Sequence, residues 1–331
     1  RIRWFTKSKK ANFWLMGEII HGDYNRWANP EMLDSTTNYE CYKGIYSSHN
    51  DGNYFEIDYS INRQSGSNGI YKNINLFNFV DNHDVNRLAS TLKDERNLKN
   101  CYTLMYGMPG IPSIYYGSEF GVKGIHENNS DDGLRPCLDL DDLLSNGNLD
   151  LYKHIVRLGR IYSVYPAMRT GNYQTIIVRN RQLLFKKELN GQIIYIALNL
   201  DENEYGFSFH TDMNFLVDVI SNQVVEINGN YDAYVKVPPF SSMVIVADDI
   251  LNEEPTAKTL ETSVERDVQI GNCYKDINGN VFKVITIAKD YDSQEDLVIY
   301  KALFGSSDTW AMPKTIFIGD VDGKQRFADA Q

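Results

Sequence analysis

The sequence has few cysteines, no excess of basic residues and no long hydrophobic run, and each absence narrows the possible functions. Its 331 residues include four cysteines, which are far apart and form no C-x-x-C pair. This argues against a metal cluster and a disulfide scaffold. Asp and Glu outnumber Lys and Arg by 44 to 33, which argues against a nucleic-acid partner because such proteins need a basic face. No apolar run approaches the roughly 20 residues of a membrane span, so we predict no membrane partner.

The overall composition is that of a soluble globular protein, with 42% hydrophobic and 23% charged residues. The length predicts two or three domains, at roughly 100–200 residues each. The sparse cysteines favour a reducing compartment, so we expect a cytoplasmic protein. Because the sequence opens on Arg1 rather than on methionine, it gives no information about a leader segment.

Residues 1–169 show short apolar runs that alternate with helical patterns. The runs 13–16, 76–80 and 111–116 have the length of buried strands, and each ends in polar residues. Apolar residues at i, i+3, i+4 and i+7 predict one helix from Leu98 and another from about Leu149, which stops before Pro166. This alternation indicates an α/β fold with a parallel sheet, in which functional side chains collect at the carboxyl ends of the strands.

From residue 170 to residue 248 the pattern changes to alternating strands. Asn190-Gly191 lies between the runs 183–187 and 192–199 and is a strong hairpin signal. Further strand patterns follow over 235–247. We therefore predict an antiparallel β domain here.

The remaining residues predict a linker and a third, small domain. Residues 249–267 are acidic and have few large apolar side chains, which is typical of an exposed linker. Residues 268–319 predict a small β-rich domain with a turn at Asn278-Gly279. Residues 320–331 are expected to form a frayed tail.

Acidic side chains follow each of the three predicted strands. They are Glu18, then Asp84 beside His83, then Glu119. Two carboxylates that meet at one sheet edge could act as a pair, one protonating a leaving group and the other stabilising a cation. Such residues also cap helices, and a lone histidine is often a buried structural residue, so this alternative stays open. The cluster Asn82-His83-Asp84 directly after an apolar run favours a functional site.

Several ordered segments resemble the α-amylase family of glycoside hydrolases (family 13). They are FWLMGEIIH at residues 13–21, FVDNHD at 79–84, GIPSIYYGSEFG at 110–121 and PPFSS at 238–242. The resemblance covers about residues 1–248. It implies the second half of a TIM (β/α)8 barrel, from its fifth strand to its eighth helix, over residues 1–169. An antiparallel β-sandwich would follow over residues 170–248.

The resemblance also implies a role for each candidate residue. Glu18 would be the general acid/base on the glycosidic oxygen, and Asp84 would bind sugar hydroxyls and stabilise the oxocarbenium-like transition state. His83 would hydrogen-bond to the sugar, and His21 is a weaker candidate on the leaving-group side. Glu119 is interpreted as structural. No residue is implied as a metal ligand and no cofactor is implied, although calcium stays an open alternative for a complete protein.

The sequence departs from the family in one important respect. The family's G-x-R-x-D segment, which carries the aspartate nucleophile, and its D-x-x-x-N-H segment are both absent from the 17 residues before Glu18. We therefore predict an N-terminally truncated, retaining hydrolase of maltodextrin or starch-like α-glucans that requires the missing N-terminal half barrel. Two alternatives stay open: an α-glucan transglycosylase, and a non-catalytic sugar-binding or scaffolding relative.

The third domain resembles a small bacterial β-rich domain of unknown function. The similarity rests on Gly271, Tyr274, the segment around Tyr300 and the Trp310-x-x-Pro313 segment. Tyr300 and Trp310 could stack on a sugar, but filling a small core is the favoured interpretation.

Overall fold

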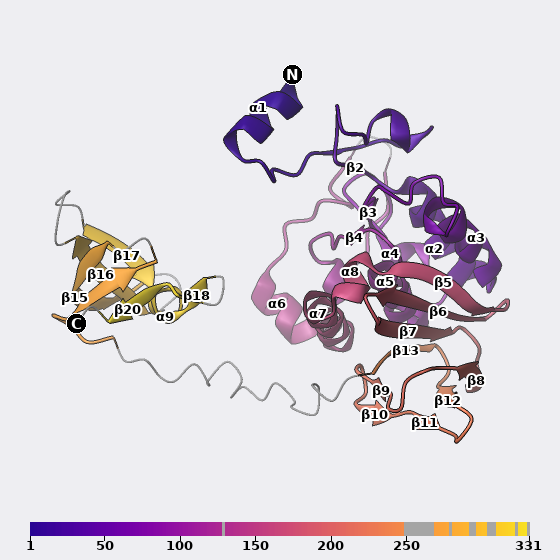
Figure 1. Cartoon of the computed structure of the whole chain (residues 1–331). Helices are drawn as coiled ribbons and strands as arrows, with labels where there is room; N and C mark the ends of the chain where they lie inside the picture. Colours follow the sequence, from indigo (N-terminus) through magenta and orange to yellow (C-terminus); the bar gives the residue numbers. More distant parts are fainter. Residues whose placement is uncertain are drawn as a thin grey trace. The chain divides into compact units, whose positions relative to one another are not determined.

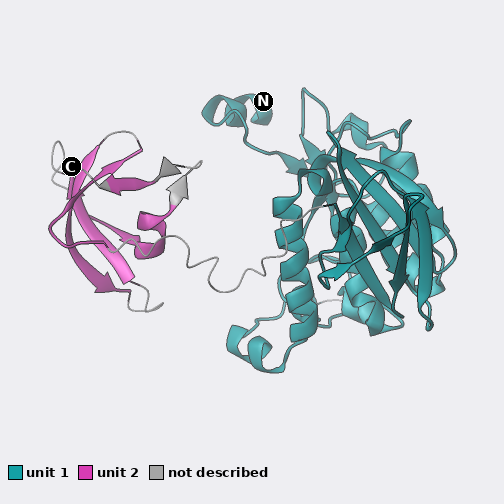
Figure 2. Cartoon of the chain, turned by 60° about the horizontal axis from the view of Figure 1, so that its bottom comes forward, with its two compact units in different colours: residues 1–252 teal, residues 253–331 magenta. Residues whose placement is uncertain are grey.

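The computed structural model describes residues 1–127, 130–247, 268–277, 280–290, 296–302, 309–321 and 324–329. The chain forms two compact units, residues 1–252 and 253–331 (Figures 1 and 2), and each is described by itself. The predicted linker and the predicted turn at Asn278-Gly279 lie outside the described residues. Within the described ranges, no helix combines the length and the apolarity that crossing a membrane requires.

Four short parallel strands form the first part of unit 1. They are β1 (Met16–Gly17), β2 (Ser35–Thr36), β3 (Phe77–Asn78) and β4 (Ile111–Pro112). β1 pairs with β2, and β3 pairs with β4. A parallel bridge between Thr37 and Phe77 joins the two pairs, so the strands follow one another in chain order. The outer edges of β1 and β4 pair with no other strand of the described residues.

These strands are shorter than the apolar runs that predict them, and β2 was not predicted from an apolar run at all. Beyond each two-residue ladder the backbone turns into the loop that carries the polar residues, which ends the pairing. β2 is polar, and the Ser35 hydroxyl donates to the Asn75 carbonyl oxygen at 2.6 Å. A search for apolar runs therefore cannot find β2.

The described residues of unit 1 form eight α-helices. α5 (Leu98–Gly107) and α7 (Leu149–Val164) begin where the periodicity predicts them. The Asn148 side chain caps α7 by accepting the Leu151 N–H at 3.0 Å. The other helices are α1 (Ile2–Lys9), α2 (Tyr39–Asp51), α3 (Tyr54–Ser65), α4 (Leu88–Thr91), α6 (Leu140–Asn146) and α8 (Pro166–Thr170).

Two antiparallel sheets make up the second part of unit 1. One has the order β10-β9-β13-β7-β6-β5 and the other the order β11-β12-β8. The predicted hairpin at Asn190-Gly191 is confirmed, and both residues have the positive φ (51° and 85°) that such a turn requires. The strands are β5 (Asn172–Val178), β6 (Gln182–Leu189), β7 (Gln192–Asn199), β8 (Tyr205–His210), β9 (Val217–Asp218), β10 (Gln223–Val224), β11 (Glu226–Ile227), β12 (Asp232–Val237) and β13 (Ser241–Val246).

The central strands of the six-stranded sheet, β6, β7 and β13, are buried on both faces. Along β6, Leu183 and Phe185 pack in one cluster with residues of α2, α3, α5 and α7. Leu184, which points to the opposite face, packs in a second cluster with Phe207 of β8 and Val235 of β12. Figure 1 shows the three-stranded sheet on the side away from the helices. The predicted boundary at residues 169–170 therefore crosses a shared hydrophobic core.

The described residues of unit 2 form a five-stranded antiparallel sheet in the order β17-β16-β15-β14-β20, a two-stranded antiparallel sheet of β18 and β19, and one short helix. The predicted frayed tail is wrong for residues 327–329, which pair with β14 as an edge strand. The Phe327 ring stacks on Phe317 at a centroid distance of 4.2 Å, which anchors this strand. The elements are β14 (Cys273–Asp276), β15 (Val281–Lys289), β16 (Asp296–Ala302), β17 (Thr309–Pro313), α9 (Lys314–Ile318), β18 (Asp320–Val321), β19 (Lys324–Gln325) and β20 (Phe327–Asp329).

The two aromatic residues that the sequence singles out in this unit have different environments. Tyr300 is 6% exposed and belongs to the hydrophobic core. Trp310 is 36% exposed and stacks on the Tyr300 ring at a centroid distance of 6.1 Å. Tyr300 therefore fills the core, and Trp310 covers its edge.

Candidate active site

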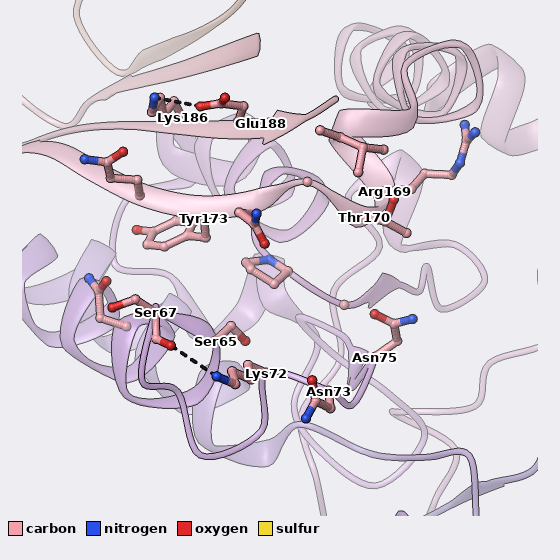
Figure 3. Close-up of a pocket in the computed structure, with 18 of the residues that line it drawn as sticks. Ser65, Ser67, Lys72, Asn73, Asn75, Arg169, Thr170, Tyr173, Lys186 and Glu188 are labelled. Carbon is pink, nitrogen blue, oxygen red and sulfur yellow. Dashed lines mark hydrogen bonds and ion pairs between the residues drawn. The ribbon is translucent and has the colours of Figure 1, made fainter. Parts of the chain in front are cut away.

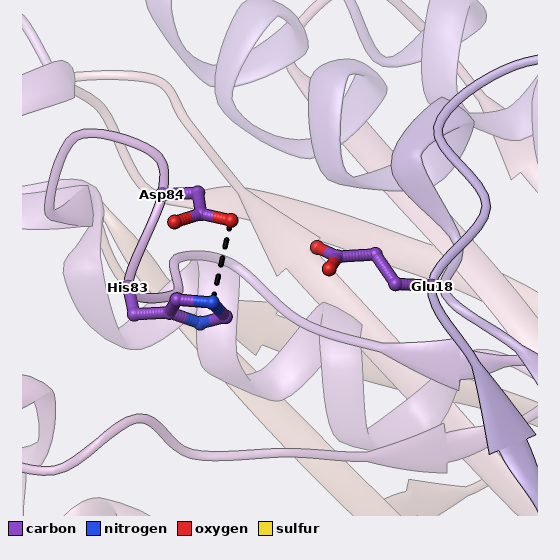
Figure 4. Close-up of side chains that lie close together, drawn as sticks. All are labelled: Glu18, His83 and Asp84. Atoms are coloured by element: carbon purple, nitrogen blue, oxygen red, sulfur yellow. Dashed lines mark ion pairs between the residues drawn. The ribbon is translucent and has the colours of Figure 1, made fainter.

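Three predicted site residues converge at the carboxyl ends of the parallel strands. Glu18 follows β1 directly, and His83 and Asp84 lie in the loop after β3. One side-chain oxygen or nitrogen from each lies within 4.8 Å of the others, and all three side chains are exposed. Figure 4 shows Glu18 pointing across an open space toward the other two. The expected convergence is observed, and the chemical roles of the residues stay predictions.

Asp84 has two basic partners. The His83 Nε2 atom lies 3.3 Å from one carboxylate oxygen, and Arg135 donates to the other oxygen at 3.0 Å. Arg135 also donates from Nε to the His83 carbonyl oxygen at 3.3 Å. The third Arg135 nitrogen, Nη1, lies 3.3 Å from a carboxylate oxygen of Asp131. The loop that carries Arg135 is thus tied to the loop that carries Asp84.

Glu18 has a different, neutral partner. The hydroxyl of Tyr39, the first residue of α2, donates to a Glu18 carboxylate oxygen at 2.9 Å. The Asn82 amide donates to the Tyr39 oxygen at 3.2 Å. The Asn82 side-chain oxygen Oδ1 accepts the backbone N–H of Asp84 at 2.8 Å and that of Val85 at 3.1 Å. One chain of hydrogen bonds therefore links the two carboxylate-bearing loops.

A buried carboxylate, Asp81, holds the loop after β3 in place through hydrogen bonds. It accepts the Leu88 N–H at 2.8 Å, which ties it to the start of α4. It also accepts the Ser118 hydroxyl at 2.8 Å. Burial raises the pKa of Asp81, and these hydrogen bonds oppose the increase. Asp81 therefore fixes the loop without entering the exposed site.

Arg87 is fully buried and joins three loops near the site. Its guanidinium donates to the carbonyl oxygens of Tyr116 at 2.6 Å and Leu134 at 2.9 Å, and to the Ser118 hydroxyl at 3.0 Å. The guanidinium carbon also lies 4.1 Å from the centre of the Tyr115 ring. Because Leu134 precedes Arg135, this network also holds the backbone from which Arg135 reaches Asp84.

Two other predicted residues do not join this group. His21 is exposed and is not part of the cluster of close ligand atoms among the described residues. One carboxylate oxygen of Glu119 is buried without a hydrogen-bond partner in the described part of the chain. Sequence reasoning missed Tyr39 and Arg135 as site residues. Asn82 carried a signal, through its place in the Asn82-His83-Asp84 cluster.

A metal ion would find its ligands in the same three side chains. Glu18, His83 and Asp84 are the group in the described ranges whose ligand atoms lie close enough together. However, both carboxylates already accept hydrogen bonds from the protein, and the group is exposed. The arrangement itself gives no reason to assign a metal.

A separate cavity of about 960 Å³ lies at the opposite ends of the strands (Figure 3). Asn75 and Gly110, which precede β3 and β4, line one side, and α3, α8, β5 and β6 supply the rest. Its charges are satisfied, since Lys186 pairs with Glu188 at 2.9 Å and Lys72 donates to the Ser67 carbonyl oxygen at 3.3 Å. Because Glu18 and Asp84 lie beyond the carboxyl ends, this cavity is not part of the candidate active site.

Comparison with known proteins gives matches for both units. Residues 1–146 match the family described as "Alpha amylase, catalytic domain", and residues 272–329 match "Protein of unknown function (DUF1653)". The chain is 24% identical to a cyclomaltodextrinase from Bacillus sp. over 60% of its own length and 35% of that protein. It is 26% identical to a maltogenic alpha-amylase from Bacillus acidopullulyticus over 62% of its length and 35% of that protein. The chain thus spans about a third of the length of these curated relatives.

Solved structures with the same fold include an alpha-amylase from Anoxybacillus, with a TM-score of 0.64 and 19% identity over 75% of this chain and 56% of that one. The alpha-amylase from Geobacillus thermoleovorans in complex with acarbose also has a TM-score of 0.64, with 18% identity over the same shares. The sequence match and the fold agree with each other. Unit 1 has short parallel strands with polar residues at their carboxyl ends, and a sheet-rich C-terminal part follows them. Residues 1–146 are thus similar in sequence to the catalytic domain of the α-amylase family of glycoside hydrolases, and unit 1 shares the fold of solved α-amylases.

Proposed function

We propose that unit 1 is the C-terminal part of a retaining hydrolase that cleaves α-glucosidic bonds in maltodextrin or starch-like glucans. The convergence of Glu18, His83 and Asp84 at the strand ends carries this proposal. The names of the relatives, cyclomaltodextrinase and maltogenic alpha-amylase, support an α-glucan as substrate. The reaction would draw on side chains alone and on no cofactor.

The partners of the two carboxylates support different roles for them. Asp84 lies between the guanidinium of Arg135 and the imidazole of His83, which suits a carboxylate that stays charged and faces a developing cation. Glu18 accepts only the neutral Tyr39 hydroxyl among the described residues, which suits a group that must carry a proton to the glycosidic oxygen. His83 and His21 would contact the sugar on either side of the bond.

We further propose that the nucleophile comes from a first half barrel that is not part of this chain. A retaining mechanism needs a nucleophilic carboxylate about 5–5.5 Å from the acid/base group. In the described residues, the close group holds no third carboxylate besides Glu18 and Asp84. Exposed apolar side chains just before and after β1 in the sequence also support a missing partner, since Phe13, Trp14 and Ile20 are 44%, 42% and 52% exposed.

Reconstitution with the missing half is the direct test. The chain would be coexpressed with a half barrel that carries the first four strand–helix units of a relative, and maltodextrin hydrolysis would be followed by ¹H NMR of the anomeric protons. We expect no hydrolysis by the chain alone, and hydrolysis with retained configuration by the complex. Activity of the chain alone would show that another carboxylate is the nucleophile. A complex that binds maltodextrin without cleaving it would support a non-catalytic sugar-binding protein instead.

Replacing Glu18 by Gln tests its assignment as the acid in the reconstituted enzyme. The amide keeps the size of the side chain and removes the transferable proton, so turnover of maltodextrin should fall at least ~100-fold. A substrate with a good leaving group, such as an α-glucosyl fluoride, needs little protonation and should lose far less in the glycosylation step. Equal losses on both substrates would mean that Glu18 is structural.

A further inference from the structure

We propose that Asn82 and Tyr39 are positioning residues that direct a single hydrogen bond onto Glu18 and couple its orientation to that of the Asp84 loop. The catalytic part of this inference rests on the proposed function. Its structural part depends only on the hydrogen-bond chain from Asn82 through Tyr39 to Glu18.

The orientation of the Asn82 amide follows from its backbone partners. Its Oδ1 atom lies 2.8 Å from the Asp84 nitrogen and 3.1 Å from the Val85 nitrogen, and both of these backbone groups are donors. The atom facing them must therefore be the acceptor of the amide, which leaves the NH₂ group facing Tyr39 at 3.2 Å. The turn that holds Asp84 thus sets the direction of the next hydrogen bond.

The direction of the Tyr39 proton follows in the same way. A phenol has one O–H proton, and the Tyr39 oxygen already accepts from the Asn82 NH₂ group, which has no lone pair to offer in return. The proton is therefore free to point to the Glu18 carboxylate oxygen at 2.9 Å. Burial raises the pKa of Tyr39; the Asn82 hydrogen bond opposes this increase and the Glu18 carboxylate adds to it. Tyr39 accordingly keeps its proton at neutral pH.

The ring of Tyr39 is held firmly enough to act as a fixed donor. It packs edge-on against Phe79 at a centroid distance of 4.9 Å and against Tyr42 at 6.0 Å. The preceding residue, Asn38, caps α2 by accepting the Cys41 N–H at 3.2 Å. The hydroxyl therefore has a defined position relative to β1 and β3.

This arrangement would serve Glu18 during proton transfer. Tyr39 occupies one carboxylate oxygen, so the other can present the proton to the glycosidic oxygen. When the proton moves to the leaving group and the C–O bond breaks, Glu18 becomes a carboxylate. A hydrogen bond to an ionised acceptor is stronger than one to a neutral acceptor, so Tyr39 stabilises the product of this transfer.

The hydrogen-bond chain can be tested in the full chain without any activity. With ¹³Cζ-labelled tyrosine, the Tyr39 resonance (identified by its loss in Tyr39→Phe) should shift as the pH is lowered. The shift should disappear in Glu18→Gln. It should persist in Tyr42→Phe, a control residue on the same helix whose ring stacks on the same Phe79. Persistence of the shift in Glu18→Gln would overturn the proposed contact.

The catalytic consequence is tested in the reconstituted enzyme. A hydrogen bond to a charged group is worth enough to change a rate roughly 10- to 100-fold, so Tyr39→Phe should lose that much on maltodextrin. It should lose less than ~3-fold on α-glucosyl fluoride, because that leaving group needs little protonation. Tyr42→Phe should keep near-normal rates on both substrates. Equal losses on both substrates would refute a role through Glu18.

Asn82→Asp separates the two functions of Asn82. The carboxylate can still accept the backbone N–H groups of Asp84 and Val85, but it offers Tyr39 an acceptor in place of a donor. The Tyr39 proton should then turn away from Glu18, and the variant should show the substrate pattern of Tyr39→Phe. A normal rate on maltodextrin would contradict the relay. If the reconstituted wild type is inactive, the proposed function fails, while the NMR result still decides the contact itself.

Discussion

Lys187 offers a quantitative test of how unit 1 is packed. It lies on β6, on the same face as Leu183 and Phe185, and its side chain is fully buried against the helices. Its Nζ atom donates to the Met168 carbonyl oxygen of α8 at 2.5 Å. No carboxylate of the described residues forms an ion pair with it. Burial lowers the pKa of Lys187 from 10.5 to about 7.

The magnitude follows from the difference between the folded and unfolded pKa. Between pH 7 and 10.5 the unfolded chain binds more protons at Lys187 than the folded chain, so the free energy of unfolding rises with pH across this window. At about 1.4 kcal/mol per pKa unit, burying this amine costs about 4 kcal/mol at pH 7 and about 1 kcal/mol at pH 10. Lys187→Met keeps the aliphatic volume and loses one hydrogen bond worth about 1 kcal/mol.

We therefore expect Lys187→Met to be more stable than the wild type by about 3 kcal/mol at pH 7 and to lose this advantage by about pH 10. Urea unfolding of the full chain, followed by near-UV circular dichroism at several pH values, measures the difference. Lys186→Met is the matched control, since Lys186 is the preceding residue and is paired with Glu188 at the surface. A stability difference for Lys187→Met that does not change with pH would refute the reasoning.

Two further predictions concern other parts of the chain. Burial lowers the pKa of His49 to about 4, so the unfolded chain binds more protons between pH 6.5 and 4 and stability is lost as pH falls through this window. His49→Gln should reduce that loss in acid titrations followed by circular dichroism; an unchanged acid transition would contradict this. Deleting residues 268–331 should leave hydrolysis of a short maltodextrin by the reconstituted enzyme within a few-fold, because Glu18, His83 and Asp84 all lie in unit 1. A large loss on that substrate would assign unit 2 a role at the active site.

The fold could be predicted where buried apolar residues recur at a regular spacing along the sequence or where a turn has a characteristic local sequence. α5 and α7 have regular apolar spacing, and the Asn190-Gly191 turn has local chemistry that fixes it. α2 and α3 were not predicted, although α3 buries Tyr54, Ile57 and Ile61 at helical spacing; small and polar residues such as Gly44 and Ser48 interrupt the apolar pattern of α2. A Cβ on Gly44 would lie 2.9 Å from an Ile57 side-chain atom, so the close approach of these helices depends on a missing side chain rather than on an apolar one.

The candidate site, too, could be predicted from the sequence only in part. Glu18, His83 and Asp84 follow strands, so their place at one sheet edge could be inferred from the order of the elements. Their partners could not. Arg135 lies 51 residues after Asp84, and Tyr39 lies 21 residues after Glu18. The conformation of the intervening loops decides those contacts, and no local pattern encodes it.

The central strands of the six-stranded sheet, which are buried on both faces, make unit 1 a single cooperative structure. Alternate side chains of β6 and β7 belong to two hydrophobic clusters at once, so neither the helices nor the three-stranded sheet could separate without exposing the middle layer to water. Cutting the chain at residues 169–170 would divide one folding unit rather than release two domains. Amide protons of β6 and β7 would exchange only through global unfolding of unit 1. Val80, in the loop that carries His83 and Asp84, packs in the same cluster as Leu183 and Phe185, so this loop is anchored to the middle layer even though the parallel strands have open edges.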